Sequence, residues 1–157
     1  MIRFKVRAAI FFLALVSTPL FAQTADKLEA ILNSPSLNWS DTVIFVLEAS
    51  GKTDFNDPME AFQFASEQKW LPKKATPADT VRFSGISLLL MRSFDQKGGI
   101  FYSLFKSPHY AYRELIQKDV IRGETDPAMA VSGQELLLMV GRLLSIIEEA
   151  EQKAGIQ

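Results

Sequence analysis

The sequence predicts an all-α protein, built as a compact bundle of helix–loop–helix repeats. Residues 55–94 and 105–144 align without a gap at an offset of fifty residues, and the apolar pattern keeps register throughout. The apolar residues recur at helical spacing, and strand-like segments are scarce. A sequence that repeats at a fixed period indicates stacked units, none of which buries its apolar face alone. We therefore expect two full units and one short N-terminal unit, at about residues 24–51, 55–94 and 105–154.

Residues 1–22 have the pattern of a cleaved secretory signal peptide. Basic residues at Arg3, Lys5 and Arg7 precede an apolar run, and the small residue Ala22 marks the cleavage site. The chain has no cysteine, which excludes both disulfides and lipid attachment at a cleavage-site cysteine. The sequence thus predicts a bacterial periplasmic or secreted protein, in which residues 23–157 form a single helical domain.

Charge and hydropathy argue against a nucleic-acid partner and against a membrane-spanning segment in that domain. Removing the three cations of the signal from a formal net charge of −1 leaves −4, and no basic block remains. Nucleic acid is therefore not an expected partner, because its phosphates require clustered Lys and Arg. No segment after the signal approaches the ~18 consecutive apolar residues of a transmembrane helix, so no membrane span is expected after cleavage.

The first unit is the short one. A helix is expected at residues 25–32, with Leu28 and Ile31 facing inward, and a Ser-Pro-Ser loop follows. Trp39-Ser40 aligns with Val131-Ser132 and opens a second helix that ends at Gly51.

The second unit repeats this plan. A helix is expected over residues 59–69, and Trp70-Leu71-Pro72 ends it. Val81 introduces the next helix, which lacks the acid of a capping box because Gly85 stands in that place. The residues expected to face inward in the two helices are Met59, Phe62, Phe64, Ala65, Ile86, Leu89, Leu90 and Phe94.

Between the second and third units, Ile100-Phe101-Tyr102 is the only segment after the signal that resembles a strand. An extended linker or a helical turn are equally good interpretations of it.

The third unit carries the clearest helix signals. A helix is expected over residues 110–118, and a loop follows. Ser132 and Glu135 fit a capping box, which opens a helix that runs to about Ala154 and stops at Gly155. We expect this to be the central helix, because its apolar residues cover more than one face: Leu136, Leu137, Met139, Val140, Leu143, Leu144 and Ile147. The alternative for the whole chain is an unrepeated helical bundle whose units are alike only in their amphipathicity.

The pattern of helix, Gly- or Pro-marked loop, and Val131-Ser132-Gly133-Gln134-Glu135 before an apolar helix resembles the S-layer homology (SLH) repeat. With Gly98-Gly99, Ser107-Pro108 and residues 110–115, the form is also similar to exported proteins of spirochaetes. The resemblance implies a helical domain of three repeats in a pseudo-threefold arrangement, which holds surface proteins to cell-wall polysaccharide.

One departure from the family pattern weakens the expectation that the ligand is a cell-wall glycan. Its second helix usually opens with a Thr-Arg-Ala-Glu motif whose arginine contacts the glycan. The chain has Gly133, Phe83 and Asp41 at that place, and only Glu135 retains the acid. Because a guanidinium binds acidic sugar groups bidentately, its loss shifts the expected partner from glycan towards protein.

No motif predicts catalysis, a cofactor or a metal site. The only histidine, His109, is next to a proline at an expected helix start, where a surface position is the simpler interpretation. Asp54, Asp57 and Glu60 lack the spacing of a calcium loop. We therefore expect a protein that is not an enzyme and that needs no cofactor.

The candidate ligand- or partner-binding residues are aromatic and cationic side chains, and each has a structural alternative. Trp70 is a platform for sugar stacking or a residue that seals the core, and the same holds for Trp39. Arg92 and Arg142 align with each other in two apolar helices. They are interpreted either as ligand-facing guanidiniums or as side chains that bind the carbonyls of an adjacent loop. The aromatic and cationic side chains of Tyr110, Tyr112 and Arg113 form either an interface or an ordinary helix start. Besides Trp70, these candidates are Arg92, Arg142, Tyr110, Tyr112 and Arg113.

The function predicted from the sequence is a non-enzymatic exported envelope protein, an SLH-like module that binds an envelope partner protein or cell-wall polysaccharide. The alternative is a periplasmic structural or assembly factor that acts as an oligomer through exposed parts of the last helix.

Overall fold

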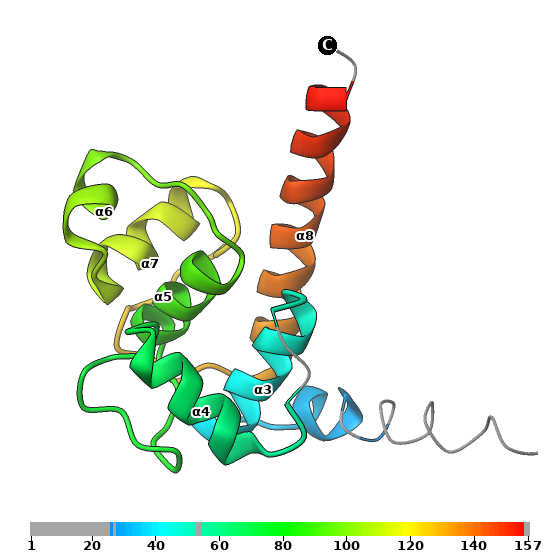
Figure 1. Ribbon diagram of the computed structural model, residues 1–157, viewed down its shortest axis with the longest axis vertical. Helices are drawn as coiled ribbons and strands as arrows, with labels where there is room; N and C mark the ends of the chain where they lie inside the picture. The colour runs from blue at the N-terminus through cyan, green and yellow to red at the C-terminus, as the bar shows by residue number, and fades with distance from the viewer. Residues whose placement is uncertain (1–25, 27, 53–54, 156–157) are drawn as a thin grey trace, which may run out of the picture.

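The computed structural model describes residues 26, 28–52 and 55–155, and within these ranges it contains helices and no strands. The all-α prediction is thus confirmed, whereas the predicted signal peptide lies outside the described residues. None of the described helices could span a membrane. A short helix at residues 28–32 precedes six longer elements (Figure 1): α3 (Trp39–Ala49), α4 (Pro58–Glu67), α5 (Phe83–Ser93), α6 (Ile100–Phe105), α7 (Pro108–Gln117) and α8 (Gly133–Gly155).

The helices follow the fifty-residue offset of the sequence alignment. Helices α4 and α7 begin fifty residues apart, as do α5 and α8. Both α4 and α7 begin with a proline behind a capping side chain, Asp57 or Ser107, which accepts a backbone N–H of the first turn. After each helix the chain turns through a left-handed residue, Lys69 (φ 58°) or Asp119 (φ 60°). The local backbone of the two units is therefore alike even where their side chains differ.

Three short segments meet in a ring of backbone hydrogen bonds. The Val81 N–H donates to Leu37 O (2.8 Å), the Val131 N–H to Val81 O (2.9 Å) and the Leu37 N–H to Val131 O (3.0 Å). All three residues are buried, and each lies two positions before a helix, α3, α5 or α8. The segments that lead into α3, α5 and α8 therefore meet at one point of the fold.

This ring corrects the alignment of the first unit by two residues. Leu37 is the residue that corresponds to Val131, so Trp39-Ser40 does not occupy the place of Val131-Ser132. The residue of this unit that corresponds to Gly133 is accordingly Trp39, which is buried, and not the exposed Asp41.

Helix α5, not α8, is the centre of the bundle. Nine of its 11 residues are buried, and it lies between α3 and α7. Helix α8 buries Gly133, Leu136, Met139, Val140 and Leu143, and its last turns project beyond the other helices (Figure 1). The expectation of a central α8 was wrong because none of the described elements covers its outer face, where Leu138 and Leu144 are 55% and 36% exposed.

Three further expectations can be compared with the structure, and two of them, both about inward-facing residues, are wrong. Leu28 and Met59, expected to face inward, are 44% and 45% exposed because each lies on the solvent side of a helix that packs through one face. The strand-like segment that begins at Ile100 is the first turn of α6, so the helical interpretation holds.

The expected capping box opens α8. The Ser132 N–H donates to Glu135 Oε2 (2.7 Å), and the Glu135 N–H donates to Ser132 Oγ (3.3 Å). Replacing Glu135 by alanine leaves the Ser132 N–H, just before the helix, without its partner, so we expect the free energy of unfolding to fall by about 1 kcal/mol in urea titrations. Ser145→Ala, in the middle of the same helix, is the control and should change it by less than about 0.5 kcal/mol. Equal losses in the two variants would contradict a specific role for the cap.

Candidate functional site

A cavity of about 580 Å³ lies where the chain leaves α4, leaves α5 and runs through α6. It has a charged and aromatic lining, unlike the apolar core behind it. Its lining residues are Trp70, Met91, Arg92, Asp95, Gln96, Lys97, Gly98, Tyr102, Ser103 and Lys106.

The turn after α4 fixes Trp70 at one wall. The left-handed Lys69 stops the helix, and the Trp70 N–H donates to Ala65 O (2.9 Å). The indole meets the ring of Phe64 edge to face, with centroids 5.6 Å apart and planes at 87°. Trp70 is half-buried, so it packs against the core and lines the cavity at the same time.

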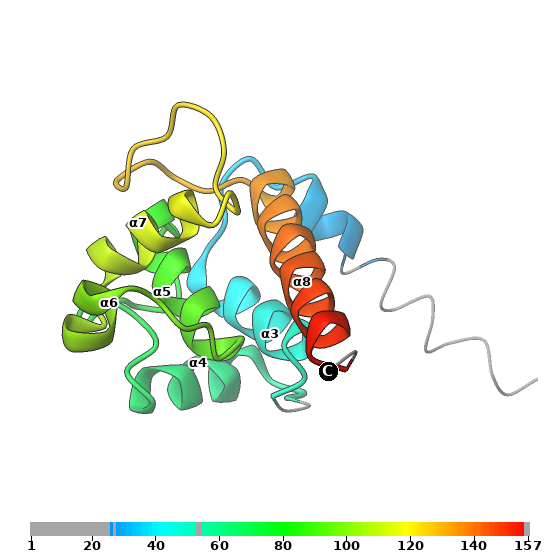
Figure 2. The ribbon, with the colours of Figure 1, turned by 90° about the horizontal axis from the view of Figure 1, so that it is seen from above.

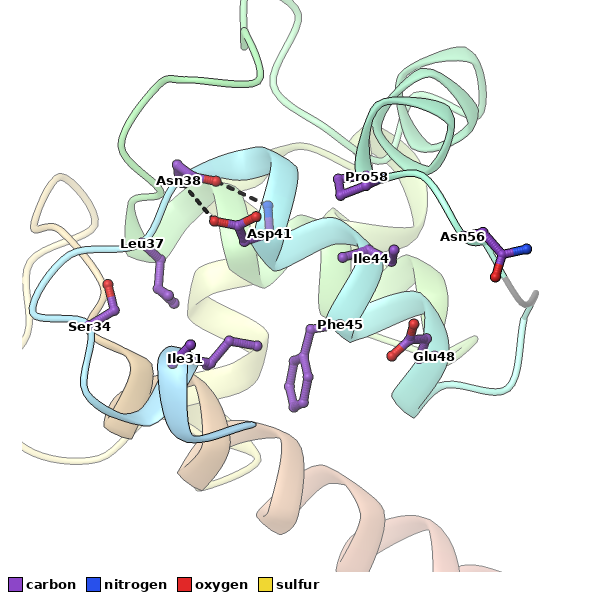
Figure 3. A pocket seen from close by; sticks show the side chains of 11 residues that line it. Ile31, Ser34, Leu37, Asn38, Asp41, Ile44, Phe45, Glu48, Asn56 and Pro58 are labelled. Carbon is purple, nitrogen blue, oxygen red and sulfur yellow. Dashed lines mark hydrogen bonds between the residues drawn. The ribbon is translucent and has the colours of Figure 1, made fainter. Parts of the chain in front are cut away.

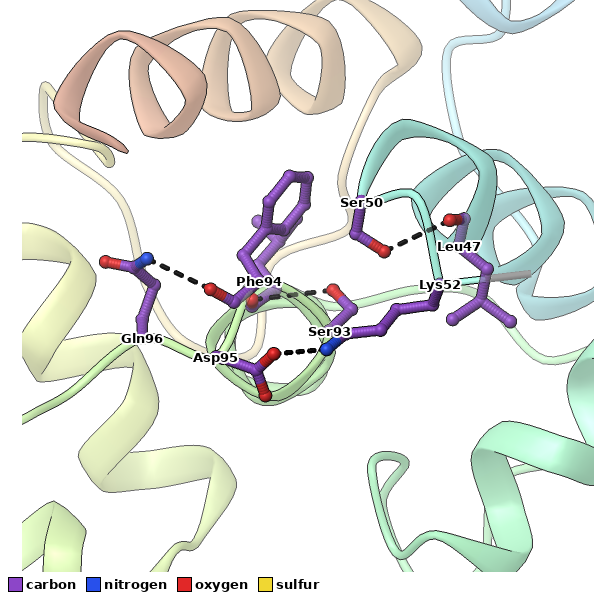
Figure 4. A network of polar contacts seen from close by, with 8 residues as sticks. Leu47, Ser50, Lys52, Ser93, Phe94, Asp95 and Gln96 are labelled. Carbon is purple, nitrogen blue, oxygen red and sulfur yellow. Dashed lines mark hydrogen bonds and ion pairs between the residues drawn. The ribbon is translucent and has the colours of Figure 1, made fainter. Parts of the chain in front are cut away.

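Three cations line the cavity, and its one carboxylate is paired. Arg92 ends α5, Lys97 precedes α6 and Lys106 follows it. Figure 4 shows the ion pair in which Lys52, which follows α3, donates to Asp95. Because Lys52 neutralises Asp95, the lining is positive overall and suits an anionic ligand.

Tyr102 supplies an unused hydrogen-bonding group to this wall. The residue is 4% exposed, and its hydroxyl is the one buried side-chain polar atom without a hydrogen-bond partner among the described residues. Burial raises the pKa of Tyr102, an effect that Arg92 opposes and Glu114 adds to, so the phenol stays protonated at neutral pH. An unsatisfied buried hydroxyl costs about 1–3 kcal/mol, which a ligand oxygen in contact with it would recover.

Two glycines hold the backbone close to Tyr102. A Cβ on Gly98 would lie 2.6 Å from Tyr102 Cδ1, so a side chain there would displace the ring. The Gly99 N–H donates to Glu114 Oε1 (2.8 Å), which ties the start of α6 to α7. The Gly98-Gly99 pair of the sequence therefore shapes this wall.

The structure brings two of the sequence-predicted site residues into this cavity, Arg92 and Trp70. Two others, Tyr110 and Arg113, line a separate groove of about 360 Å³ beside Phe101. Tyr110 stacks on Phe101 there, with centroids 5.7 Å apart and planes at 12°.

The remaining two candidates make structural contacts. Arg142 Nη1 donates to Val120 O (2.8 Å), the loop-carbonyl contact of the structural alternative. The hydroxyl of the buried Tyr112 bonds Thr125 O (2.7 Å) and fixes the loop before α8. Among the described residues Arg92 makes no such contact, so the two aligned arginines differ in environment. Trp39, 3% exposed, also packs in the core.

Sequence reasoning missed Lys97, Tyr102 and Lys106. Lys97 and Tyr102 lie between the second and third repeat units, in a segment that the repeat alignment leaves out, and Lys106 is the second residue of the third unit. The available signals were the Gly-Gly pair and the two lysines that bracket a short apolar segment. None of these signals predicts that Tyr102 turns inward while its neighbours face solvent.

A second cavity, of about 400 Å³, lies between residues 30–34, α3 and the start of α4 (Figure 3). Its lining is mostly apolar, with Ile44 and Phe45 from α3, and its charged residues are the acids Asp41 and Glu48. The side-chain amide of Asn38 donates to Asp41 Oδ2 (2.9 Å), and its oxygen accepts the Asp41 N–H (3.0 Å). This lining does not suit an anion.

Comparison with models of protein families, with curated proteins and with solved structures gave no match to the chain.

Proposed function

We propose that the protein is a non-enzymatic exported module of the bacterial cell envelope, which binds an acidic cell-wall polysaccharide in the cavity between α5 and α6. The observation that carries this proposal is the unpaired, buried hydroxyl of Tyr102 in a wall that also contains Arg92 and two lysines. The resemblance to SLH repeats supports the ligand class, and the signal-like residues 1–22 support export.

Each lining group has a distinct part in recognising such a ligand. The planar guanidinium of Arg92 suits a carboxylate or a pyruvyl group, which it can bind through two parallel hydrogen bonds. Lys97 and Lys106 add charge without fixed geometry. The aromatic face of Trp70 suits the apolar face of a sugar ring, and Tyr102 donates one hydrogen bond. In this proposal Arg92 takes the part of the missing SLH arginine, from a different place in the repeat.

Arg92→Ala is expected to weaken binding to purified cell-wall polysaccharide by about tenfold or more, because charge-assisted hydrogen bonds to the anion are lost. Binding would be measured by sedimentation with insoluble wall material and by titration calorimetry with soluble fragments. Arg122→Ala is the matched control, since Arg122 is exposed, pairs with Asp119 and lies outside the cavity. Absence of saturable binding, or equal losses in the two variants, would contradict the proposal.

Tyr102→Phe separates binding from stability at the same wall. Removing an unsatisfied hydroxyl should leave the free protein as stable as before or more stable by about 1 kcal/mol, while polysaccharide binding weakens about fivefold. The folded-state pKa of Tyr102 is raised, so its protonated form contributes stability below the ordinary tyrosine pKa that is lost as pH rises through the folded pKa. The loss of stability in alkali should therefore be smaller in the variant. A large loss of stability at neutral pH would show that the hydroxyl has a structural partner instead.

The second candidate function is that of a periplasmic assembly factor acting as an oligomer, and the outer face of α8 favours it. No residue after Leu143 is buried in this helix, and Leu138 and Leu144 are exposed on it. An oligomer that persists on serial dilution in sedimentation velocity runs, and that Leu138→Glu dissociates, would support this function over glycan binding.

A further inference from the structure

Helix α6 exposes almost its whole outer face as large apolar side chains. The exposed fractions are 84% for Ile100, 63% for Phe101, 72% for Leu104 and 57% for Phe105. At 100° per residue these four positions fall on one side of the helix, opposite the buried Tyr102. Soluble proteins rarely expose a contiguous apolar patch of this kind unless it contacts a partner or a membrane. We call these four side chains the α6 face.

The α6 face is held in place by the rest of the fold. Tyr102 is buried beneath it, and the Ser103 hydroxyl donates to Gly98 O (3.2 Å). The ring of Tyr110 on α7 stacks on both phenylalanines of the face: centroids are 5.7 Å apart for Phe101 and 5.5 Å for Phe105, with planes at 12° and 21°. The apolar side chains are therefore presented by an ordered helix and not by a frayed loop.

Exposed cations surround the α6 face. Lys97 and Lys106 lie at the two ends of α6, and Arg113 lies beside Phe101 in the groove between α6 and α7. Residues 97–118 contain four Lys or Arg and one acid, although the whole chain has 17 Lys and Arg against 18 Asp and Glu. That acid, Glu114, accepts the Gly99 N–H. The charge near the face is thus opposite in sign to the charge of the chain as a whole.

We infer that the α6 face is a membrane-surface site, which inserts into the interface of a bilayer that contains anionic lipid. Its apolar side chains would enter the boundary between headgroups and acyl chains, with the aromatic rings at headgroup depth. The three cations would lie over the anionic headgroups. Helix α6 lies at the margin of the bundle, on the side away from α8, where it can meet a flat surface (Figures 1 and 2). This attachment needs no membrane span, and it shares Lys97 and Lys106, but not Arg92, with the proposed glycan cavity.

The chain has no cysteine, so one introduced thiol can carry a polarity-sensitive dye at a single site. In the full chain, Leu104→Cys places the dye on the α6 face, and Leu138→Cys places it on α8 at a leucine that is 55% exposed. Each protein is mixed with vesicles of phosphatidylcholine alone or with added phosphatidylglycerol. We expect a blue shift and a severalfold rise in emission at position 104 with the anionic vesicles only, and no change at position 138. Because the dye reports its own surroundings, attachment through another segment would not produce this pattern.

The role of the cations is tested by second substitutions in the dye-labelled Leu104→Cys chain. Arg113→Glu should weaken the response to anionic vesicles about 30-fold, because it replaces a cation by an anion and each charge near the surface contributes about 1 kcal/mol. Arg92→Ala, in the glycan cavity, should leave it unchanged, so the two proposals fail separately. The inference would be overturned by the absence of any shift at position 104, or by equal shifts with both kinds of vesicle. A shift that grows with protein concentration without vesicles would overturn it too, because the face would then pair with a second copy of the chain.

Discussion

Replacing Leu89 by alanine is expected to lower the free energy of unfolding by about 3 kcal/mol, among the largest effects of any single substitution in this protein. Leu89 is fully buried in the middle of α5, the helix that packs against both α3 and α7. Truncation removes its transfer free energy and leaves a void that neighbours on several sides cannot close. Since domains of this size are stable by only about 5–15 kcal/mol, urea titration followed by circular dichroism would show a large shift of the midpoint.

Leu138→Ala is the matched control, because it makes the same change on the exposed face of α8. We expect it to change the free energy of unfolding by about 0.5 kcal/mol or less. The pair of variants also decides between two arrangements of the bundle, since the sequence places the central helix at α8 and the structure places it at α5. A loss at Leu138 as large as the loss at Leu89 would show that α8 is covered, either within the chain or by a second copy.

The elements of the fold could be predicted from sequence because their signals are local. The capping box at Ser132 and Glu135 and the prolines at the starts of α4 and α7 act through the nearest turn of backbone. The alignment at an offset of fifty residues added the equivalence of α4 with α7 and of α5 with α8. These signals say where a helix begins, and they need no knowledge of what lies next to it.

What could not be predicted depends on which neighbour covers which face. The apolar stripe of α8 is wider than that of an ordinary surface helix, yet its outer leucines are exposed because nothing in the part of the chain that the structure describes packs there. The two-residue shift of the first unit is likewise set by backbone hydrogen bonds between Leu37, Val81 and Val131, which are far apart in sequence.

The candidate site was predicted in part for the same reason. Arg92 and Trp70 could be identified because a cation in an apolar helix and a tryptophan at a helix end are unusual in any context. Tyr102 could not, because its importance comes from a missing hydrogen-bond partner, which only the packed structure reveals.

Gly133→Ala is expected to lower the free energy of unfolding by about 2–4 kcal/mol, although alanine favours helix by about 1 kcal/mol over glycine. A Cβ at this position would clash with the backbone carbonyl of Ile31, and the Gly133 N–H donates to Ser34 O (2.9 Å). The segment at residues 28–34 would have to detach from α8 or the start of α8 would have to move. Thermal and urea unfolding would measure the loss, and proteolysis would report detachment of the segment.

Gly141→Ala in the same helix is the control for propensity, because a Cβ there meets no atom within 4 Å. It should stabilise the protein by about 0.5–1 kcal/mol, opposite in sign to the effect at Gly133. Stabilisation by both substitutions would mean that residues 28–34 do not rest on α8. The backbone of Ile31 leaves no room for a side chain at Gly133, and the first residues of α3 and α5, Trp39 and Phe83, are buried. All three positions serve packing in this fold, so the proposed glycan site takes its guanidinium from Arg92, in the last turn of α5.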